Sequence, residues 1–161
     1  MADNPYLKSS RLPDVIAAIT ALGTYKFYKL DAAGWAERIS GRQKPAKHWV
    51  TVFDEHPEFF RRATETEKFS LVWRRQFPRN YNVDSEDEVS PDHQLAGNAY
   101  DRISRRPLEP PELTALINVA VNLHQAALGR DTSKRWWIPL AAAGLGFVGA
   151  IIGGLIGRHA G

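Results

Sequence analysis

Residues 59–77 read FFRRATETEKFSLVWRRQF and have the pattern of a two-stranded antiparallel ribbon. Two extended runs, 59–64 and 68–77, are separated by the polar triplet at 65–67, which is long enough for a hairpin loop. In the second run, large apolar side chains recur at alternate positions, as expected when one face of a strand is buried. These side chains are Phe69, Leu71, Trp73 and Phe77. The ribbon therefore predicts a small core that is completed by other elements.

Three helices and a short strand are expected before this ribbon, because residues that start and stop helices recur at suitable intervals. The expected elements are a helix over 10–22, an extended piece over 25–30, a helix between Asp31 and Gly41, and a helix over 44–55. Asp31 is a favourable N-cap, and Gly23 and Gly41 are favourable C-terminal stops. The ribbon thus follows a compact helical segment.

This order of elements resembles that of a winged-helix domain, and the resemblance covers residues 10–80. It rests on the order and spacing of elements, without a diagnostic motif. Most winged-helix domains bind DNA, with the third helix in the major groove and the wing on the backbone or minor groove, while a minority only bind proteins. The resemblance implies a small winged-helix-like α+β domain over residues 1–83. The alternative is another small α+β domain with a two-stranded ribbon.

Basic side chains that could bind nucleic acid or another anion lie on the third helix and the ribbon. They are Lys44, Lys47, His48, Arg61, Arg62, Arg74 and Arg75. Guanidinium groups on adjacent strands can bind phosphate or carboxylate groups bidentately. However, Glu65 and Glu67 at the ribbon tip would repel a phosphate backbone, and the arginines could instead pair with nearby carboxylates. The sequence therefore favours a protein partner over sequence-specific DNA.

The composition bears on the possible chemistry. The 161 residues include no cysteine, which excludes disulfides, thiolate metal sites and cysteine nucleophiles. The five histidines lack the spacing of metal ligands, and the sequence contains no glycine-rich phosphate loop or nucleophile-elbow serine. We therefore expect a protein that is not an enzyme and that uses no cofactor or metal.

The segment after the ribbon is acidic and then helical. Residues 84–93 contain five carboxylates and predict a flexible charged linker. A helical segment is expected over 94–129, with a first helix that ends before Pro107 and a stronger one over 112–128. The second helix has a broad apolar face, which requires a partner. That partner is either the preceding domain or the same helix of another copy.

The end of the chain carries no charge over residues 136–157. As a helix these 22 residues would extend about 33 Å, which matches the thickness of a bilayer core, about 30 Å. We therefore expect a transmembrane helix over 134–158, with Lys134, Arg135, Trp136 and Trp137 at the membrane interface. Because basic residues remain on the cytoplasmic side, this predicts a single-pass, tail-anchored protein of the inner or plasma membrane with a cytoplasmic N-terminal domain. A buried C-terminal helix is the alternative.

Small residues recur at intervals of four in this run, a spacing that lets transmembrane helices associate closely. The glycines concerned are Gly146, Gly149, Gly153, Gly154 and Gly157. We therefore expect a homo-oligomer. Two functions are compatible with this organisation. One is a membrane-tethered winged-helix adaptor or regulator that binds a protein or nucleic acid partner. The other is a sensor–effector of toxin or defence type that permeabilises the membrane. The absence of polar residues in the run favours the first, because a pore needs a polar lining.

Overall fold

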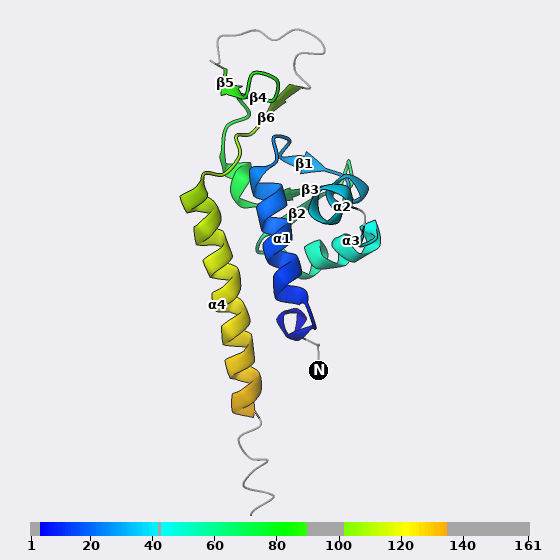
Figure 1. The fold of residues 1–161 in the computed structure, drawn as a ribbon, viewed down its shortest axis with the longest axis vertical. Coiled ribbons are helices and arrows are strands. Elements are labelled where there is room, and N and C mark those ends of the chain that lie inside the picture. The colour runs from blue at the N-terminus through cyan, green and yellow to red at the C-terminus, as the bar shows by residue number, and fades with distance from the viewer. Residues whose placement is uncertain (1–3, 42, 90–101, 135–161) are drawn as a thin grey trace, which may run out of the picture. The chain divides into compact units, whose positions relative to one another are not determined.

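The computed structural model describes residues 4–41, 43–89 and 102–134 (Figure 1). Its helices are η1 (Pro5–Leu7), α1 (Arg11–Thr24), α2 (Ala32–Ser40), α3 (Ala46–Glu55), η2 (Trp73–Gln76) and α4 (Pro110–Lys134). Its strands are β1 (Lys29–Leu30), β2 (Phe60–Ala63), β3 (Lys68–Leu71), β4 (Tyr81–Asn82), β5 (Asp87–Glu88) and β6 (Ile103–Ser104). The chain divides into two compact units after His124, and the core and sites described below belong to the first unit.

The predicted order of helix, short strand, two helices and a two-stranded ribbon is confirmed by α1, β1, α2, α3, β2 and β3. Helix α2 begins and ends as predicted, because Asp31 Oδ1 accepts a hydrogen bond from Gly34 N at 2.7 Å and Gly41 adopts a φ of 56° at the C-cap. The role predicted for Gly23 is wrong. It lies inside α1, where an added Cβ would stand 3.2 Å from the side chains of Leu108 and Leu113. Gly23 therefore permits close packing and does not end the helix.

The first sheet is antiparallel, with the strand order β1-β3-β2. Lys29 of β1 and Arg61 of β2 both lie opposite Ser70 of β3. The second strand of the ribbon is shorter than predicted, because the chain leaves the sheet after Leu71 and forms η2. Trp73 is consequently 40% exposed and does not share the buried face of Phe69 and Leu71.

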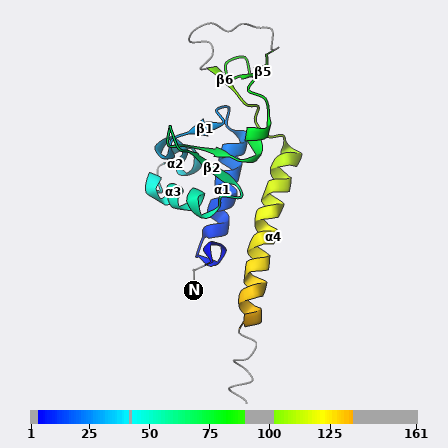
Figure 2. The same ribbon diagram turned by 180° about the vertical axis from the view of Figure 1, so that it is seen from behind.

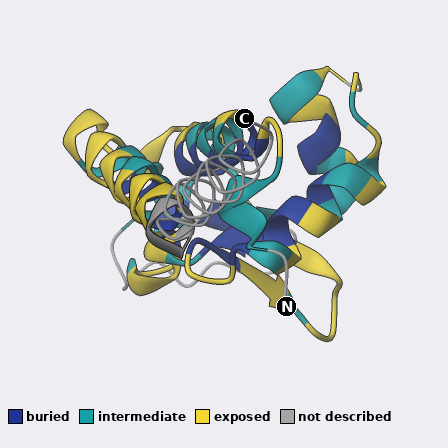
Figure 3. Cartoon of the chain, turned by 90° about the horizontal axis from the view of Figure 1, so that it is seen from below, coloured by how far each residue is buried: buried dark blue, intermediate teal, exposed yellow. Residues whose placement is uncertain are grey.

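The core lies between the first three α-helices and the sheet. Its largest members are Ile19, Leu22, Trp35, Trp49, Phe53, Phe60, Phe69 and Leu71. Leu116 and Ala120 of α4 belong to the same core, so the part of the helix before Gln125 buries apolar residues against its own domain. Figures 1 and 2 show α1 between α2 and α3 on one side and the part of α4 before Gln125 on the other. In Figure 3 the helices have buried residues on one side and exposed residues on the other.

The prediction of a flexible linker over 84–93 is wrong for the part that the structure describes. Residues 84–86 form a turn, and Asp87–Glu88 is the strand β5 of a second sheet, ordered β5-β4-β6. Ile103, expected at the end of a helix, lies in β6 and pairs with β4. Residues 90–101, which hold the rest of that expected helix, lie outside the described residues.

The structure also corrects the prediction of a C-terminal transmembrane helix. Within the described residues, no helix combines the length and apolar character needed to cross a bilayer. Helix α4 has 25 residues but carries polar side chains along its length, and Lys134, expected to begin the membrane helix, ends α4. The fold class is therefore α+β, with four α-helices and two small sheets among the described residues. This finding contradicts the expected single-pass, tail-anchored membrane protein.

The remaining residues of the predicted membrane segment cannot be placed in this fold. Arg135, Trp136 and Trp137, and the glycines at 146–157, lie outside the described residues.

Candidate functional site

Two of the predicted binding residues, Lys44 and His48, contact a buried carboxylate. The side chain of Asp14 on α1 is only 8% exposed, and its Oδ2 lies 2.8 Å from His48 Nε2. Its Oδ1 accepts a hydrogen bond from Lys44 Nζ. Both side chains are therefore engaged within the domain. Lys47 is exposed, and its side chain has no partner among the described residues.

Arg61 and Arg62 of the ribbon lie on opposite faces of β2. Arg62 lies over the ring of Phe69, 5.5 Å from its centroid, and its Nε donates to Glu67 Oε2 at 2.7 Å. It also lies 3.6 Å from Asp54 of α3. Arg62 therefore bridges the ribbon tip and α3. Arg61 lies on the other face and has no side-chain partner within the described residues.

Arg74 was predicted to bind an anion, but it is fully buried. Its guanidinium donates to four backbone carbonyls, those of Leu22, Tyr25, Arg105 and Arg106. Burial lowers its pKa from the ordinary value of arginine to about 10. Leu22 and Tyr25 lie at the C-terminal end of α1, where carbonyls lack helical partners and attract a cation. Arg74 is therefore a structural residue that fixes η2 against α1, and the prediction of a binding role for it is wrong.

The surface expected to contact DNA has no net charge. Residues 44–68 contain five basic and five acidic side chains. The basic ones are Lys44, Lys47, Arg61, Arg62 and Lys68, and the acidic ones are Asp54, Glu55, Glu58, Glu65 and Glu67. DNA binding depends on cations that replace the counterions of phosphates. A balanced surface provides little of that attraction.

The turn η2 presents a different kind of surface. Trp73 is 40% exposed, and the neighbouring Arg75 is exposed with no side-chain partner among the described residues. Tryptophan and arginine are enriched at the centres of protein–protein interfaces. The sequence pattern placed Trp73 in the core and therefore missed this surface.

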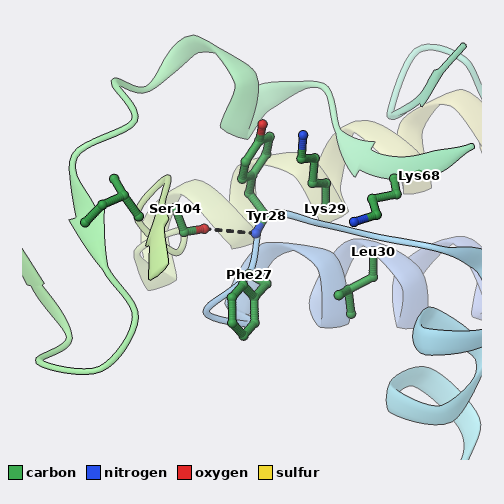
Figure 4. Close-up of a pocket in the computed structure, with 7 residues that line it drawn as sticks. Phe27, Tyr28, Lys29, Leu30, Lys68 and Ser104 are labelled. Carbon is green, nitrogen blue, oxygen red and sulfur yellow. Dashed lines mark hydrogen bonds between the residues drawn. The ribbon is translucent and has the colours of Figure 1, made fainter. Parts of the chain in front are cut away.

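A pocket of about 450 Å³ lies where β1 meets β6 (Figure 4). Its lining consists of Phe27, Tyr28, Lys29, Leu30, Lys68, Ile103 and Ser104. Ser104 Oγ accepts a hydrogen bond from Tyr28 N at 3.1 Å. Burial alone would raise the pKa of the Tyr28 phenol, but the adjacent Lys29 and Arg105 outweigh it and hold the pKa below its ordinary value. In Figure 4 the Tyr28 hydroxyl and the Lys29 ammonium group lie beside each other.

A polar cluster joins η1 to the start of β2. His56 is buried, and its Nδ1 lies 3.1 Å from Glu58 Oε1, which also accepts a hydrogen bond from the Tyr6 hydroxyl. Burial and the contact with Glu58 raise the pKa of Tyr6. Burial would raise the pKa of Glu58, but the hydrogen bonds from His56 and Tyr6 lower it overall. In the described part of the chain, no three His, Asp or Glu side chains form a group that could hold a metal ion.

Comparisons of this chain with models of protein families, with curated proteins and with solved structures find no match. A function for this chain is therefore inferred from its own residues and their contacts.

Proposed function

We propose that residues 10–80 form a winged-helix domain that acts as a non-catalytic adaptor for a protein partner. The element order α1-β1-α2-α3-β2-β3 supports this, because it follows the order that the resemblance implies. In this proposal β2 and β3 form the wing, and α3 corresponds to the helix that enters the major groove in DNA-binding members.

A protein partner is preferred over DNA because three of the predicted binding residues contact carboxylates within the domain. Lys44 and His48 contact the buried Asp14, and Arg62 pairs with Glu67 and Asp54. A DNA-binding surface needs free cations for phosphates and free side chains for base edges. Here, releasing a side chain from Asp14 would leave a buried carboxylate with fewer partners, which costs free energy.

The surface around η2 offers the partner a rigid contact. Trp73 is exposed, while the next residue, Arg74, is held by four backbone carbonyls. An aromatic anchor on a fixed backbone loses little conformational entropy on binding, so more of its contact energy contributes to affinity. We therefore place the main contact of the partner at Trp73 and Arg75.

Affinity capture with the full chain tests this proposal. A bound protein should remain after nuclease treatment and should be lost with Trp73→Ala, because truncation of a central aromatic anchor commonly costs 2 kcal/mol or more. Val119→Ala is the matched control, since Val119 is a 46% exposed apolar residue on another element, α4. Capture that disappears with nuclease, or that depends equally on Val119, would contradict the proposal.

A further inference from the structure

We propose that the pocket between β1 and β6 binds a phosphate monoester of nucleotide size, with its phosphate between Lys29 and Lys68 and its apolar part against Phe27, Leu30 and Ile103. This inference concerns a surface distinct from η2 and does not depend on the proposed protein partner.

The first support is an uncompensated pair of cations. Two of the seven lining residues are lysines, and none is acidic. Lys29 pairs with Ser70, which lies two residues along β3 from Lys68, so the two lysines are diagonal neighbours on one face of the sheet. Diagonal neighbours are about 7–8 Å apart at their Cα atoms, within reach of long side chains. One dianionic group can therefore reach both ammonium groups once the Lys29 side chain turns away from the Tyr28 hydroxyl, beside which it lies in Figure 4.

The second support is that neither lysine pairs with a carboxylate of the described residues. Lys68 has no side-chain partner within the described residues, and the contacts found for Lys29 are with Tyr28. This differs from two basic residues around α3, since Asp14 pairs with Lys44, and Asp54 and Glu67 pair with Arg62. Lysine binds phosphate as a compact point charge with three donors. A doubly charged phosphate fits two such groups better than a carboxylate does.

The third support is the composition of the remaining walls. A volume of about 450 Å³ lies within the usual range for small-molecule pockets, about 300–1,000 Å³. Inorganic phosphate would fill only a small part of it. Phe27, Leu30 and Ile103 provide apolar surface, and Ser104 provides a hydroxyl group. A few polar groups that fix orientation within apolar walls are typical of such sites.

More cations lie close to this pocket. Arg105 lies 5.2 Å from the ring centroid of Tyr28, and Arg102 lies 5.5 Å from that of Phe27. Arg102 is paired with Asp84, whereas Arg105 donates to the carbonyl of Phe77. Arg105 therefore adds positive charge near the phenol, and no carboxylate in the described part of the chain pairs with it. The electrostatic field at the mouth of the pocket attracts anions.

Calorimetric titration of the full chain tests this site with adenosine 5′-monophosphate, adenosine and inorganic phosphate as separate probes. The monophosphate should bind at least about tenfold more tightly than either of the other two, because only it uses both the lysines and the apolar walls. Lys29→Gln and Lys68→Gln should each weaken its binding by about tenfold, the loss of one charge-assisted hydrogen bond. Lys47→Gln, the same change at an exposed lysine of α3, should leave it unchanged.

Two further probes distinguish a free nucleotide from a strand end. A short oligothymidylate with a 5′-phosphate that binds more tightly than its unphosphorylated form supports a strand end, and tighter binding of the free monophosphate supports a small-molecule ligand. Equal binding of adenosine and its monophosphate would overturn the proposal. So would equal binding of the two oligonucleotides together with undetectable binding of the monophosphate, or an effect of Lys47→Gln as large as that of Lys29→Gln.

Discussion

Replacing Arg74 with methionine should destabilise the domain more than any exposed substitution. Methionine has a similar length but no donor, so the carbonyls of Leu22, Tyr25, Arg105 and Arg106 would each lose a hydrogen bond. These carbonyls come from the end of α1 and from the segment before α4. The substitution would therefore loosen the junction of both with η2.

The magnitude follows from two opposing terms. A buried acceptor left without its partner costs about 1–3 kcal/mol, which for four carbonyls amounts to about 8 kcal/mol. Removing the buried cation relieves its desolvation, and the lowering of the Arg74 pKa to about 10 corresponds to about 3 kcal/mol. The difference, about 5 kcal/mol, agrees with the cost of breaking a buried charged contact, about 3–5 kcal/mol. For a chain of this size we expect the Tm to fall by about 10–20 °C.

Thermal and urea unfolding of the full chain measure this loss. Arg74→Lys keeps the charge but cannot reach four carbonyls, so it should lose an intermediate amount, about 2–3 kcal/mol. The matched control is Arg75→Met, which should change stability by no more than about 0.5 kcal/mol because Arg75 is exposed. A loss below about 1 kcal/mol for Arg74→Met, or an equal loss for Arg75→Met, would refute the structural role of Arg74.

Two other predictions concern backbone conformation and alkaline pH. Gly41→Ala should lower the free energy of unfolding by about 1 kcal/mol because Gly41 has a φ of 56°. Gly129→Ala should raise the free energy of unfolding by about 0.5–1 kcal/mol, because Gly129 lies in open space on α4 and alanine favours a helix. Urea unfolding that changes the stability of both variants in the same direction would contradict these conformations. Since the folded state raises the pKa of Tyr6 above its ordinary value of 10.0, the Tyr6 hydroxyl contributes stability that is complete below about pH 10 and is lost as the pH rises through the folded pKa. The wild type should therefore lose more stability than Tyr6→Phe between neutral and strongly alkaline pH, and parallel stability curves would show that the contact with Glu58 is unimportant.

Local signals in the sequence were sufficient to predict the order of the elements from α1 to β3. Asp31 and Gly41 cap the two ends of α2 as predicted, because capping depends on residues that are close in the sequence. The alternation of apolar residues correctly predicted that Phe69 and Leu71 are buried. It wrongly predicted the same for Trp73, which is exposed. The chain turns after Leu71 so that Arg74 reaches carbonyls distant in sequence, and a period-2 pattern contains no information about such contacts.

The pocket and the carboxylate partners of the basic residues could not be predicted from the sequence, because both depend on tertiary contacts. The pocket combines residues 27–30 with Lys68 and residues 103–104. The contact between Asp14 and Lys44 joins α1 to the segment just before α3, and the two residues are 30 positions apart in the sequence. The sequence showed that cations were present on α3 and the ribbon, but only the structure showed which of them have carboxylate partners.

We expect that the surface of α3 and the β2–β3 ribbon does not recognise DNA, and a measurement of duplex DNA binding by the full chain tests this most directly. Fluorescence anisotropy at physiological salt, with several unrelated duplexes, should give dissociation constants no tighter than about 10⁻⁶ M and similar for all sequences, as in weak non-specific binding. Nanomolar binding to a particular sequence, weakened by Lys47→Gln and falling steeply with salt, would contradict the account.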